Sequence, residues 1–184
     1  MSTTKRSSTE TITLGSGDLY CTEYTGTTPD VETLCVDDNL LGLIKGGASI
    51  EYTPTYYEAT DDMGRVKKII ITEEEALLKS GIITWNGNTL KKLCSTARVT
   101  EASGKRTVKI GGAGNDDGKS YALCFHHSSE ADGDVWVLIV GKNNSGMVIT
   151  FAKDSETVID AEFKALPQDD EGTLIQFIEE MPTE

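Results

Sequence analysis

The sequence predicts a mainly β protein: a β-sandwich or barrel with a flanking α-helix and a long protruding hairpin. Short apolar segments alternate with turns along the 184 residues, which include 18 Gly and only 4 Pro. Many segments are rich in Val, Ile and Thr, the residues that favour strands. We count about eleven extended segments and two helical ones, a pattern typical of packed sheets with helices at their periphery.

A chain of 184 residues is long enough to bury a core and falls in the size range of one domain. We expect the polar residues 1–10 to form a flexible arm and residues 11–184 to form a single β-sandwich domain. No apolar run follows the basic pair Lys5-Arg6, and no later segment reaches membrane-spanning length. We therefore expect synthesis in a cytoplasm without a secretion signal or membrane anchor. Four widely spaced cysteines are typical of reduced, partly buried thiols: Cys21, Cys35, Cys94 and Cys124.

Several short strands are expected before the hairpin. Residues 11–14, 18–24 and 33–36 read as strands separated by Gly-rich or polar turns, and the apolar run 40–44 follows. Residues 48–57 are extended by pattern, although Pro54 lies inside them, so this strand should lie at a sheet edge. Residues 65–72 run back after a turn.

The hairpin over residues 46–72 carries more apolar and aromatic side chains than its two strands can cover. We expect either an arm that packs on a neighbouring subunit or an ordinary hairpin folded onto its own core, and the sequence leaves both open. The candidate contact residues are Ile50, Tyr52, Tyr56, Tyr57, Val66, Ile69 and Ile71.

Two helices are predicted. Residues 72–81 begin with capping-box spacing and acids in the first turn, and Gly81 ends the segment. Residues 89–97 place apolar side chains on one face at helical spacing, so this helix should lie on a sheet. A hairpin over residues 98–110 and a strand over residues 121–126 follow.

The C-terminal part reads as four strands. Residues 134–140 are almost continuously apolar, as in a strand buried on both faces, and residues 147–151 follow after a turn. Residues 158–165 alternate strictly, with Phe163 among the apolar residues on one face and charged residues on the other. Residues 173–179 complete the set.

The charge excludes a general nucleic-acid binder, and no catalytic site emerges. The formal net charge is −13, with ten acids and two bases from Thr150 onward, whereas phosphate contacts need Lys and Arg. Residues 113–120 match a loose phosphate-loop pattern, but a strand rather than a helix is expected after them. His126, His127 and Cys124 lack a second pair at metal-ligand spacing. We therefore expect a non-enzymatic protein without cofactor or metal.

Three runs carry a resemblance to a known family: residues 41–52, residues 154–165 and residues 172–175. They resemble the tail tube (major tail) proteins of tailed bacteriophages, of the siphophage type. The similarity extends over most of the chain, with residues 1–10 least covered. Its motifs are structural rather than catalytic.

This resemblance implies a β-sandwich with a flanking helix that assembles into hexameric rings, stacked as the tube that conducts double-stranded DNA into the host. Its expected location is the virion tail, after synthesis in the bacterial cytoplasm. Its expected partners are copies of itself and other tail proteins, namely the tape measure, the tail terminator and the distal tail protein. A conduit should not bind its cargo, and like charge on the wall lets DNA slide. The candidate lumen acids are Asp160, Glu162, Asp169, Asp170 and Glu171.

Two alternatives stay open. The chain could form the inner tube of a contractile phage tail or tail-like particle, which would differ by needing a sheath partner. In a different class, it could be a monomeric ligand-binding β-sandwich, in which aromatic residues such as Tyr52, Tyr56, Tyr57 and Trp85 bind a small molecule or glycan. The hairpin discriminates between these classes: we expect it to be ordered only on assembly in a tube subunit, and to be ordered in the monomer of a ligand-binding sandwich.

Overall fold

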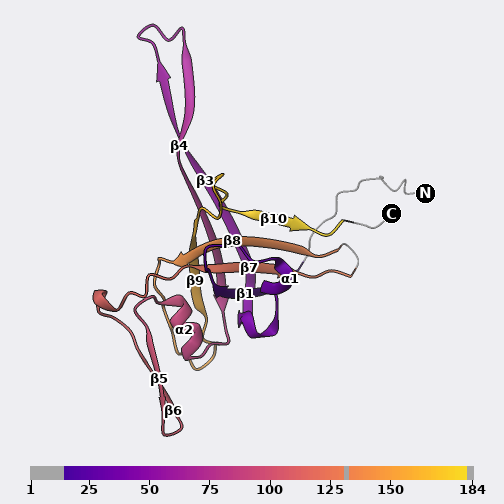
Figure 1. Ribbon diagram of the computed structural model, residues 1–184, viewed down its shortest axis with the longest axis vertical. Coiled ribbons are helices and arrows are strands. Elements are labelled where there is room, and N and C mark those ends of the chain that lie inside the picture. Colours follow the sequence, from indigo (N-terminus) through magenta and orange to yellow (C-terminus); the bar gives the residue numbers. More distant parts are fainter. Residues whose placement is uncertain (1–14, 131–132, 182–184) are drawn as a thin grey trace, which may run out of the picture.

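The computed structural model describes residues 15–130 and 133–181 (Figure 1). Within them the protein is mainly β, with a large antiparallel sheet, a flanking α-helix and a long protruding hairpin, as the sequence predicts. The predicted arm over residues 1–10 and the predicted strand over residues 11–14 lie outside the described residues.

One sheet holds eight strands in the order β2-β1-β7-β8-β9-β4-β3, with β10 paired to β8. All its strand pairs are antiparallel. The strands are β1 (Asp18–Glu23), β2 (Leu40–Gly42), β3 (Ile44–Thr60), β4 (Lys67–Ile82), β7 (Tyr121–His127), β8 (Val135–Asn143), β9 (Ile159–Leu166) and β10 (Gln176–Glu179).

The sheet curls round because β2 and β3 stand at its two ends yet are separated in sequence only by Leu43. The Ile83 backbone N–H donates to the Leu43 carbonyl at 2.8 Å, and the Leu43 N–H donates to Thr84 Oγ1 at 2.7 Å. Gly42 permits this approach, because a Cβ there would lie 2.2 Å from the Thr84 carbonyl oxygen. The chain thereby joins both sheet edges in a barrel-like sandwich.

The core lies on both faces of β7 and β8. Leu123 and Ile139 point into the larger cluster, which also contains Phe163 of β9 and the apolar face of α2 (Gly87–Leu93). Ala122, Leu138 and neighbouring residues form a second cluster under the short helix α1 (Val31–Leu34). The prediction that residues 134–140 form a strand buried on both faces is confirmed.

Helix α2 forms near its predicted position because its N-terminus is capped. The Asn86 side chain accepts hydrogen bonds from the backbone N–H groups of Asn88 and Thr89, completing a capping box. The buried Thr89 hydroxyl also donates to the Leu41 carbonyl at 3.2 Å, which ties the helix to β2. The predicted hairpin follows as β5 (Arg98–Ala102) and β6 (Lys105–Lys109), and short 3-10 turns lie at Asp37–Asn39 and Ala113–Asn115.

The predicted helix over residues 72–81 is wrong: the segment continues strand β4. Ala76, Leu78, Ser80 and Ile82 are buried while the intervening residues are less so, which is a period of two. β4 pairs with β3 on one side and, through its last part, with β9 on the other. This tertiary pairing outweighs the local capping signal.

Three smaller predictions are also corrected. Residues 33–36 do not form a strand. The short helix α1 ends at Leu34 instead, and its residues Val31 and Leu34, three positions apart, are both buried on one side of the helix. Residues 147–151 form no strand, although Met147 and Ile149 pack on the core, because the segment pairs with no described strand. The last strand is shorter than residues 173–179, because the Thr173 carbonyl accepts from the Gln168 N–H in a turn.

The centre of the core provides a test of this packing. Phe163 is 0% exposed, so Phe163→Ala should lower the free energy of unfolding by about 3–5 kcal/mol through lost burial and a residual cavity. The control is Phe151→Ala, at a side chain that is 78% exposed, which should change it by no more than ~0.5 kcal/mol. Urea denaturation measures both, and equal effects would contradict the assigned core.

Candidate assembly surface on the protruding hairpin

The β3–β4 ribbon leaves the body of the molecule where β4 loses its second neighbour. β4 pairs with β9 from Leu77 to Ile82, whereas its pairing with β3 continues outward to the pair Thr60↔Lys67. Over residues 52–76 the two strands have only each other among the described strands, and Figure 1 shows them projecting from the sheet. About nine residues per strand give a projection of roughly 30 Å.

Polar contacts define the tip of this ribbon. The Asp61 carboxylate accepts hydrogen bonds from the backbone N–H groups of Arg65 and Val66 and lies 3.1 Å from Arg65 Nε. The Val66 N–H above all lowers the pKa of Asp61. The Lys67 ammonium lies 2.7 Å from a Glu58 carboxylate oxygen across the strands. The tip is therefore held by interactions of its own.

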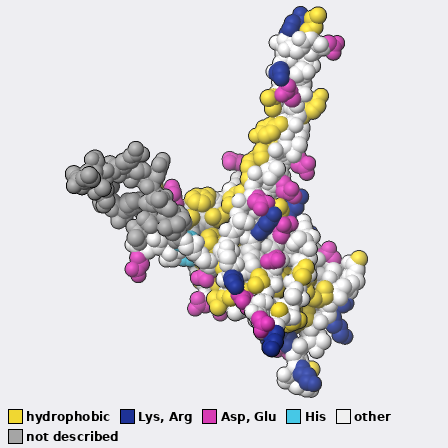
Figure 2. Space-filling model, turned by 180° about the vertical axis from the view of Figure 1, so that it is seen from behind, with side chains coloured by type: hydrophobic (Ala, Val, Ile, Leu, Met, Phe, Trp, Pro, Cys, Tyr) yellow, Lys and Arg dark blue, Asp and Glu magenta, His cyan; other side chains and the backbone are white. Residues whose placement is uncertain are grey.

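One face of the ribbon carries an apolar strip that continues the inner surface of the sheet. Residues opposite each other in an antiparallel pair share a face, and the pairs Ile50↔Leu78, Tyr52↔Ala76 and Tyr56↔Ile71 run outward from the core. We name the exposed part the hairpin apolar strip: Ile50, Tyr52, Tyr56, Ile69 and Ile71. Figure 2 shows hydrophobic side chains following the ribbon.

The strip is exposed in the described chain. Tyr56 is 58% exposed and Ile69 is 59% exposed, although both belong to residue types that are usually buried or interfacial. The two other predicted contact residues lie apart: Tyr57 points to the opposite face beside Ile70, and Val66 lies at the tip. The structure thus brings five of the seven candidates together. Ile70, 47% exposed on the opposite face, was missed by the sequence analysis.

A polar recess lies at the root of the strip. The Tyr52 hydroxyl donates a hydrogen bond to Glu74, and this contact raises the pKa of Tyr52. Glu74 and Glu171 line a recess of about 390 Å³ together with Leu174 and Ile175. Two exposed carboxylates therefore meet at one concave site where the ribbon joins the body.

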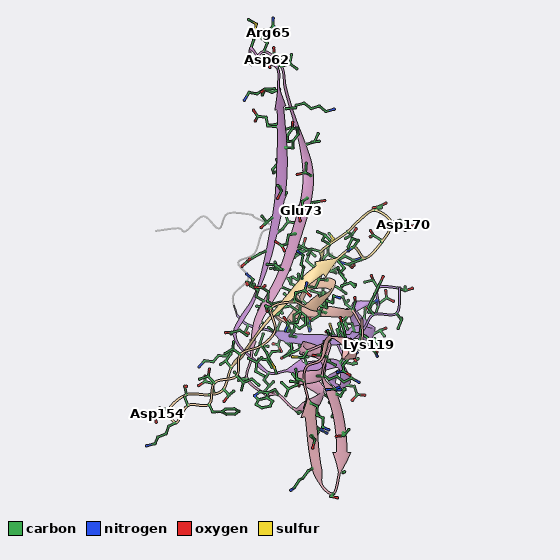
Figure 3. All side chains as sticks on the ribbon, turned by 90° about the vertical axis from the view of Figure 1, so that its left-hand side faces the viewer. Asp62, Arg65, Glu73, Lys119, Asp154 and Asp170 are labelled. Atoms are coloured by element: carbon green, nitrogen blue, oxygen red, sulfur yellow. The ribbon has the colours of Figure 1, made fainter. Side chains whose placement is uncertain are left out.

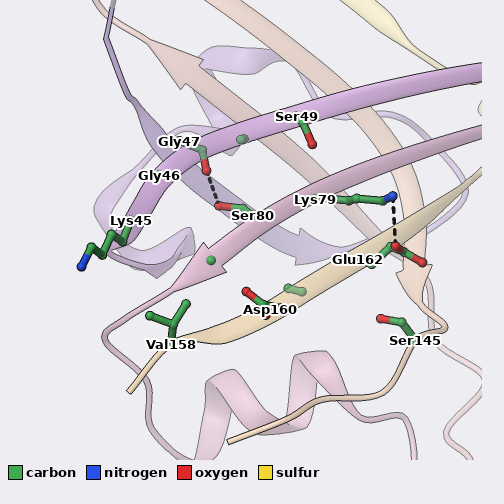
Figure 4. Close-up of a pocket in the computed structure, with 13 residues that line it drawn as sticks. Lys45, Gly46, Gly47, Ser49, Lys79, Ser80, Ser145, Val158, Asp160 and Glu162 are labelled. Atoms are coloured by element: carbon green, nitrogen blue, oxygen red, sulfur yellow. Dashed lines mark hydrogen bonds and ion pairs between the residues drawn. The ribbon is translucent and has the colours of Figure 1, made fainter. Parts of the chain in front are cut away.

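The five candidate lumen acids fall into two groups. Asp160 and Glu162 project from the outer face of β9, beside a recess of about 560 Å³ lined by Gly46 and Gly47 (Figure 4). Glu162 lies 3.3 Å from the Lys79 ammonium, which also contacts Glu51 at 2.9 Å. Glu51 above all raises the pKa of Lys79. Glu162 is thus partly neutralised within its own chain.

The second group occupies the turn after β9. The Asp169 carboxylate accepts from the backbone N–H groups of Thr173 at 2.9 Å and Glu171 at 3.1 Å, and the Thr173 contact above all lowers the pKa of Asp169. Glu171 borders the recess on the core-facing side of the ribbon, whereas Glu162 pairs with Lys79 on its other side. Asp170 is exposed in the same turn (Figure 3).

The other motifs have structural partners. In the segment 113–120 the Lys119 ammonium is engaged by Glu23, the Asp117 carboxylate accepts the Lys119 N–H, and strand β7 follows directly. His126 Nε2 lies 2.8 Å from Asp134 and its ring stacks on Trp136 at 5.1 Å, while His127 Nδ1 lies 2.6 Å from the Ser16 carbonyl oxygen.

All four cysteines are free thiols: Cys21 and Cys124 are buried, and Cys35 and Cys94 are half-buried. Burial raises the pKa of the Cys21 thiol to about 12. In the described ranges, no three His, Cys, Asp or Glu side chains gather closely enough to hold a metal ion. Nor does any helix there have the length and apolar character needed to span a membrane.

Two comparisons with known proteins, one with family models and one with curated proteins, gave no match.

The turn after β9 should make stability depend on pH in the acid range. Because the folded pKa of Asp169 lies below its unfolded value of about 3.9, its contribution is present above pH ~4 and is lost as pH falls through the folded pKa. Asp169→Asn should therefore lower the urea midpoint at pH 7 and converge with wild type near pH 2. Asp170→Asn removes one negative charge from the same turn but none of those backbone contacts, so it should leave the urea midpoint at pH 7 unchanged. If both variants lowered the midpoint equally, the role of Asp169 would be contradicted.

Proposed function

We propose that this chain is the structural subunit of a bacteriophage tail tube, which assembles into hexameric rings that stack around a bore for double-stranded DNA. The observation that carries the proposal is the hairpin apolar strip on a two-stranded ribbon that extends roughly 30 Å beyond the body of the sheet. The sequence resemblance of residues 41–52, 154–165 and 172–175 to tail tube proteins supports the same reading.

Energetics favour a partner for this ribbon. An isolated two-stranded hairpin is at best marginally stable in water, whereas a third strand or a packed face stabilises it. Fully burying an exposed Ile or Tyr contributes about 1.5–3 kcal/mol, so the half-exposed side chains of the strip would each add on the order of 1 kcal/mol in a contact. Tyr56 and Ile71 sit at the middle of this surface.

The charge agrees with a conduit for DNA. The formal net charge of −13 disfavours adsorption of a polyanion, and a wall of like charge lets DNA pass without sticking. On this proposal either Asp160 with Glu162 or the turn acids Asp169, Asp170 and Glu171 face the bore, and the separation of the two groups gives them different environments in a ring. The other tail proteins, namely the tape measure, tail terminator and distal tail protein, would bind the ends of the tube in the virion.

The hairpin supports both tail classes equally. A contractile tail would add a sheath around the same tube, and no feature of the described residues favours a sheath. The monomeric ligand-binding alternative predicts that Tyr52, Tyr56 and Tyr57 contact a small molecule. Since Tyr57 lies on the face of the ribbon opposite Tyr52 and Tyr56, the three aromatic residues do not all converge on one site.

The test is negative-stain electron microscopy of the full chain with light scattering for mass. Wild type should form rings or hollow tubes at high concentration. Tyr56→Ser combined with Ile71→Ser should reduce the assembled fraction at least tenfold, because it removes the centre of the hairpin apolar strip, while the urea midpoint of the monomer stays close to that of wild type.

Phe177→Ser is the control, because Phe177 is 65% exposed on β10, which pairs with β8 and not with either strand of the ribbon. It should assemble like wild type. The proposal is contradicted if wild type stays monomeric at all concentrations, including after addition of preformed tail tips, or if the hairpin double variant assembles as well as the control.

A further inference from the structure

Charge is unevenly distributed along this acidic chain. Residues 87–111, which form α2, β5 and β6, contain six bases and one acid, a net charge of +5, although the whole chain carries −13. The bases are Lys91, Lys92, Arg98, Lys105, Arg106 and Lys109, and the acid is Glu101. Figure 2 shows Lys and Arg side chains gathered at this end of the molecule.

The β5–β6 hairpin separates these charges between its two faces. Its inner face packs on α2, since a Cβ at Gly87 would lie 3.0 Å from Val108 and 2.5 Å from the Arg106 side chain. The acid Glu101 belongs to this inner face, where it lies 2.6 Å from Arg106 Nε. The strand register therefore leaves the outer face without an acid.

We name this surface the basic outer face: Arg98, Lys105 and Lys109, with Thr100, Ala102 and Thr107 between them. All six residues are exposed. Arg98 and Lys109 stand directly opposite each other in register, an arrangement of like charges that destabilises a strand pair. The hairpin thus carries a repulsion that an external anionic group would relieve.

These charges have no counterion within the described chain. None of Arg98, Lys105 and Lys109 forms an ion pair with a described acid, although Arg98 donates to the Gly111 carbonyl. Most of the described bases outside residues 87–111 do form one: Lys45, Arg65, Lys67, Lys79, Lys119 and Lys164. The contrast marks the basic outer face as a surface for a partner.

The complementary charge lies across the body from the β5–β6 hairpin, at the root of the long ribbon. The recess at the root of the long ribbon holds the exposed carboxylates of Glu74 and Glu171, Asp170 lies in the adjoining turn, and no base lines the recess. Figures 1 and 3 place the β5–β6 hairpin at one end of the long axis and the long ribbon at the other, and Figure 3 shows Asp170 on the ribbon side. We call this surface the acidic recess.

We propose that the basic outer face of one copy docks on the acidic recess of the next copy. Because the two surfaces differ and lie on separate parts of the molecule, the contact is heterologous, and a heterologous contact that does not close on itself repeats into an open stack. This inference rests on the proposed function and names the surfaces that join successive rings. Exposed ion pairs are individually weak and screened by salt, so the contact should steer register and weaken as ionic strength rises.

The test uses two neutralised forms of the full chain. Lys105→Gln with Lys109→Gln removes charge from the basic outer face. Glu74→Gln with Glu171→Gln removes it from the acidic recess, while the amide introduced in place of Glu74 keeps an acceptor for the Tyr52 hydroxyl. In sedimentation at low salt each variant alone should show at least tenfold less assembly than wild type. An equimolar mixture should form end-to-end pairs, because one intact contact remains.

Two further variants make the result specific. Lys142→Gln with Lys153→Gln removes two bases outside the basic outer face and should assemble like wild type. The full exchange, Lys105→Glu and Lys109→Glu with Glu74→Lys and Glu171→Lys, should restore assembly, because complementarity is kept with the signs reversed. Circular dichroism checks that each variant is folded.

The outcomes separate this inference from the proposed function. If wild type and both neutralised variants assemble alike, or if the full exchange fails to restore assembly by a folded chain, the docking contact is wrong while the tail-tube function stands. If wild type does not assemble and the mixture forms no pairs, both fail. Binding of a short DNA duplex that is lost with Lys105→Gln and Lys109→Gln, with assembly unchanged, would overturn the docking contact in favour of nucleic acid.

Discussion

The structure depends on the pairing of β3 with β4 beyond the edge of the body. Every backbone N–H and carbonyl needs a partner, and within the sheet β4 finds one on each side. From Ala76 outward to Lys67, β4 pairs only with β3. The ribbon therefore keeps its strand form, but the core no longer covers its inner face. The apolar surface of the core consequently continues outward into solvent along Tyr52, Tyr56 and Ile71.

The same geometry gives the molecule two unlike ends. The sheet is joined at Leu43, so the ribbon projects from one end, while α2 and the β5–β6 hairpin occupy the other. Apolar surface gathers on the ribbon and unpaired positive charge gathers on the β5–β6 hairpin, within a chain whose net charge is −13. Ends of such unlike character agree with the open assembly that we propose.

The sequence predicted secondary structure correctly where the spacing of apolar residues determines it, and wrongly where pairing with a strand distant in sequence determines it. The alternation of residues 158–165 and the apolar run over residues 134–140 predicted β9 and β8, and the helical spacing of apolar residues from Leu90 onward predicted α2. Residues 72–81 misled because capping-box chemistry is local, whereas the strand β9 that pairs with them lies about 80 residues later. The basic outer face and the separation of the five candidate lumen acids depend on how distant strands pair, which no local pattern reveals.

Amide hydrogen exchange of residues 52–76, compared between the isolated chain and its assembled form, tests the central claim most directly. If the ribbon is an assembly element, its solvent-facing amides should exchange quickly in the monomer and become at least tenfold slower in the assembly, while amides of the β7–β8 pair stay protected in both. Equal exchange of residues 52–76 in the two forms would contradict the account, because the ribbon would then contact nothing beyond its own chain.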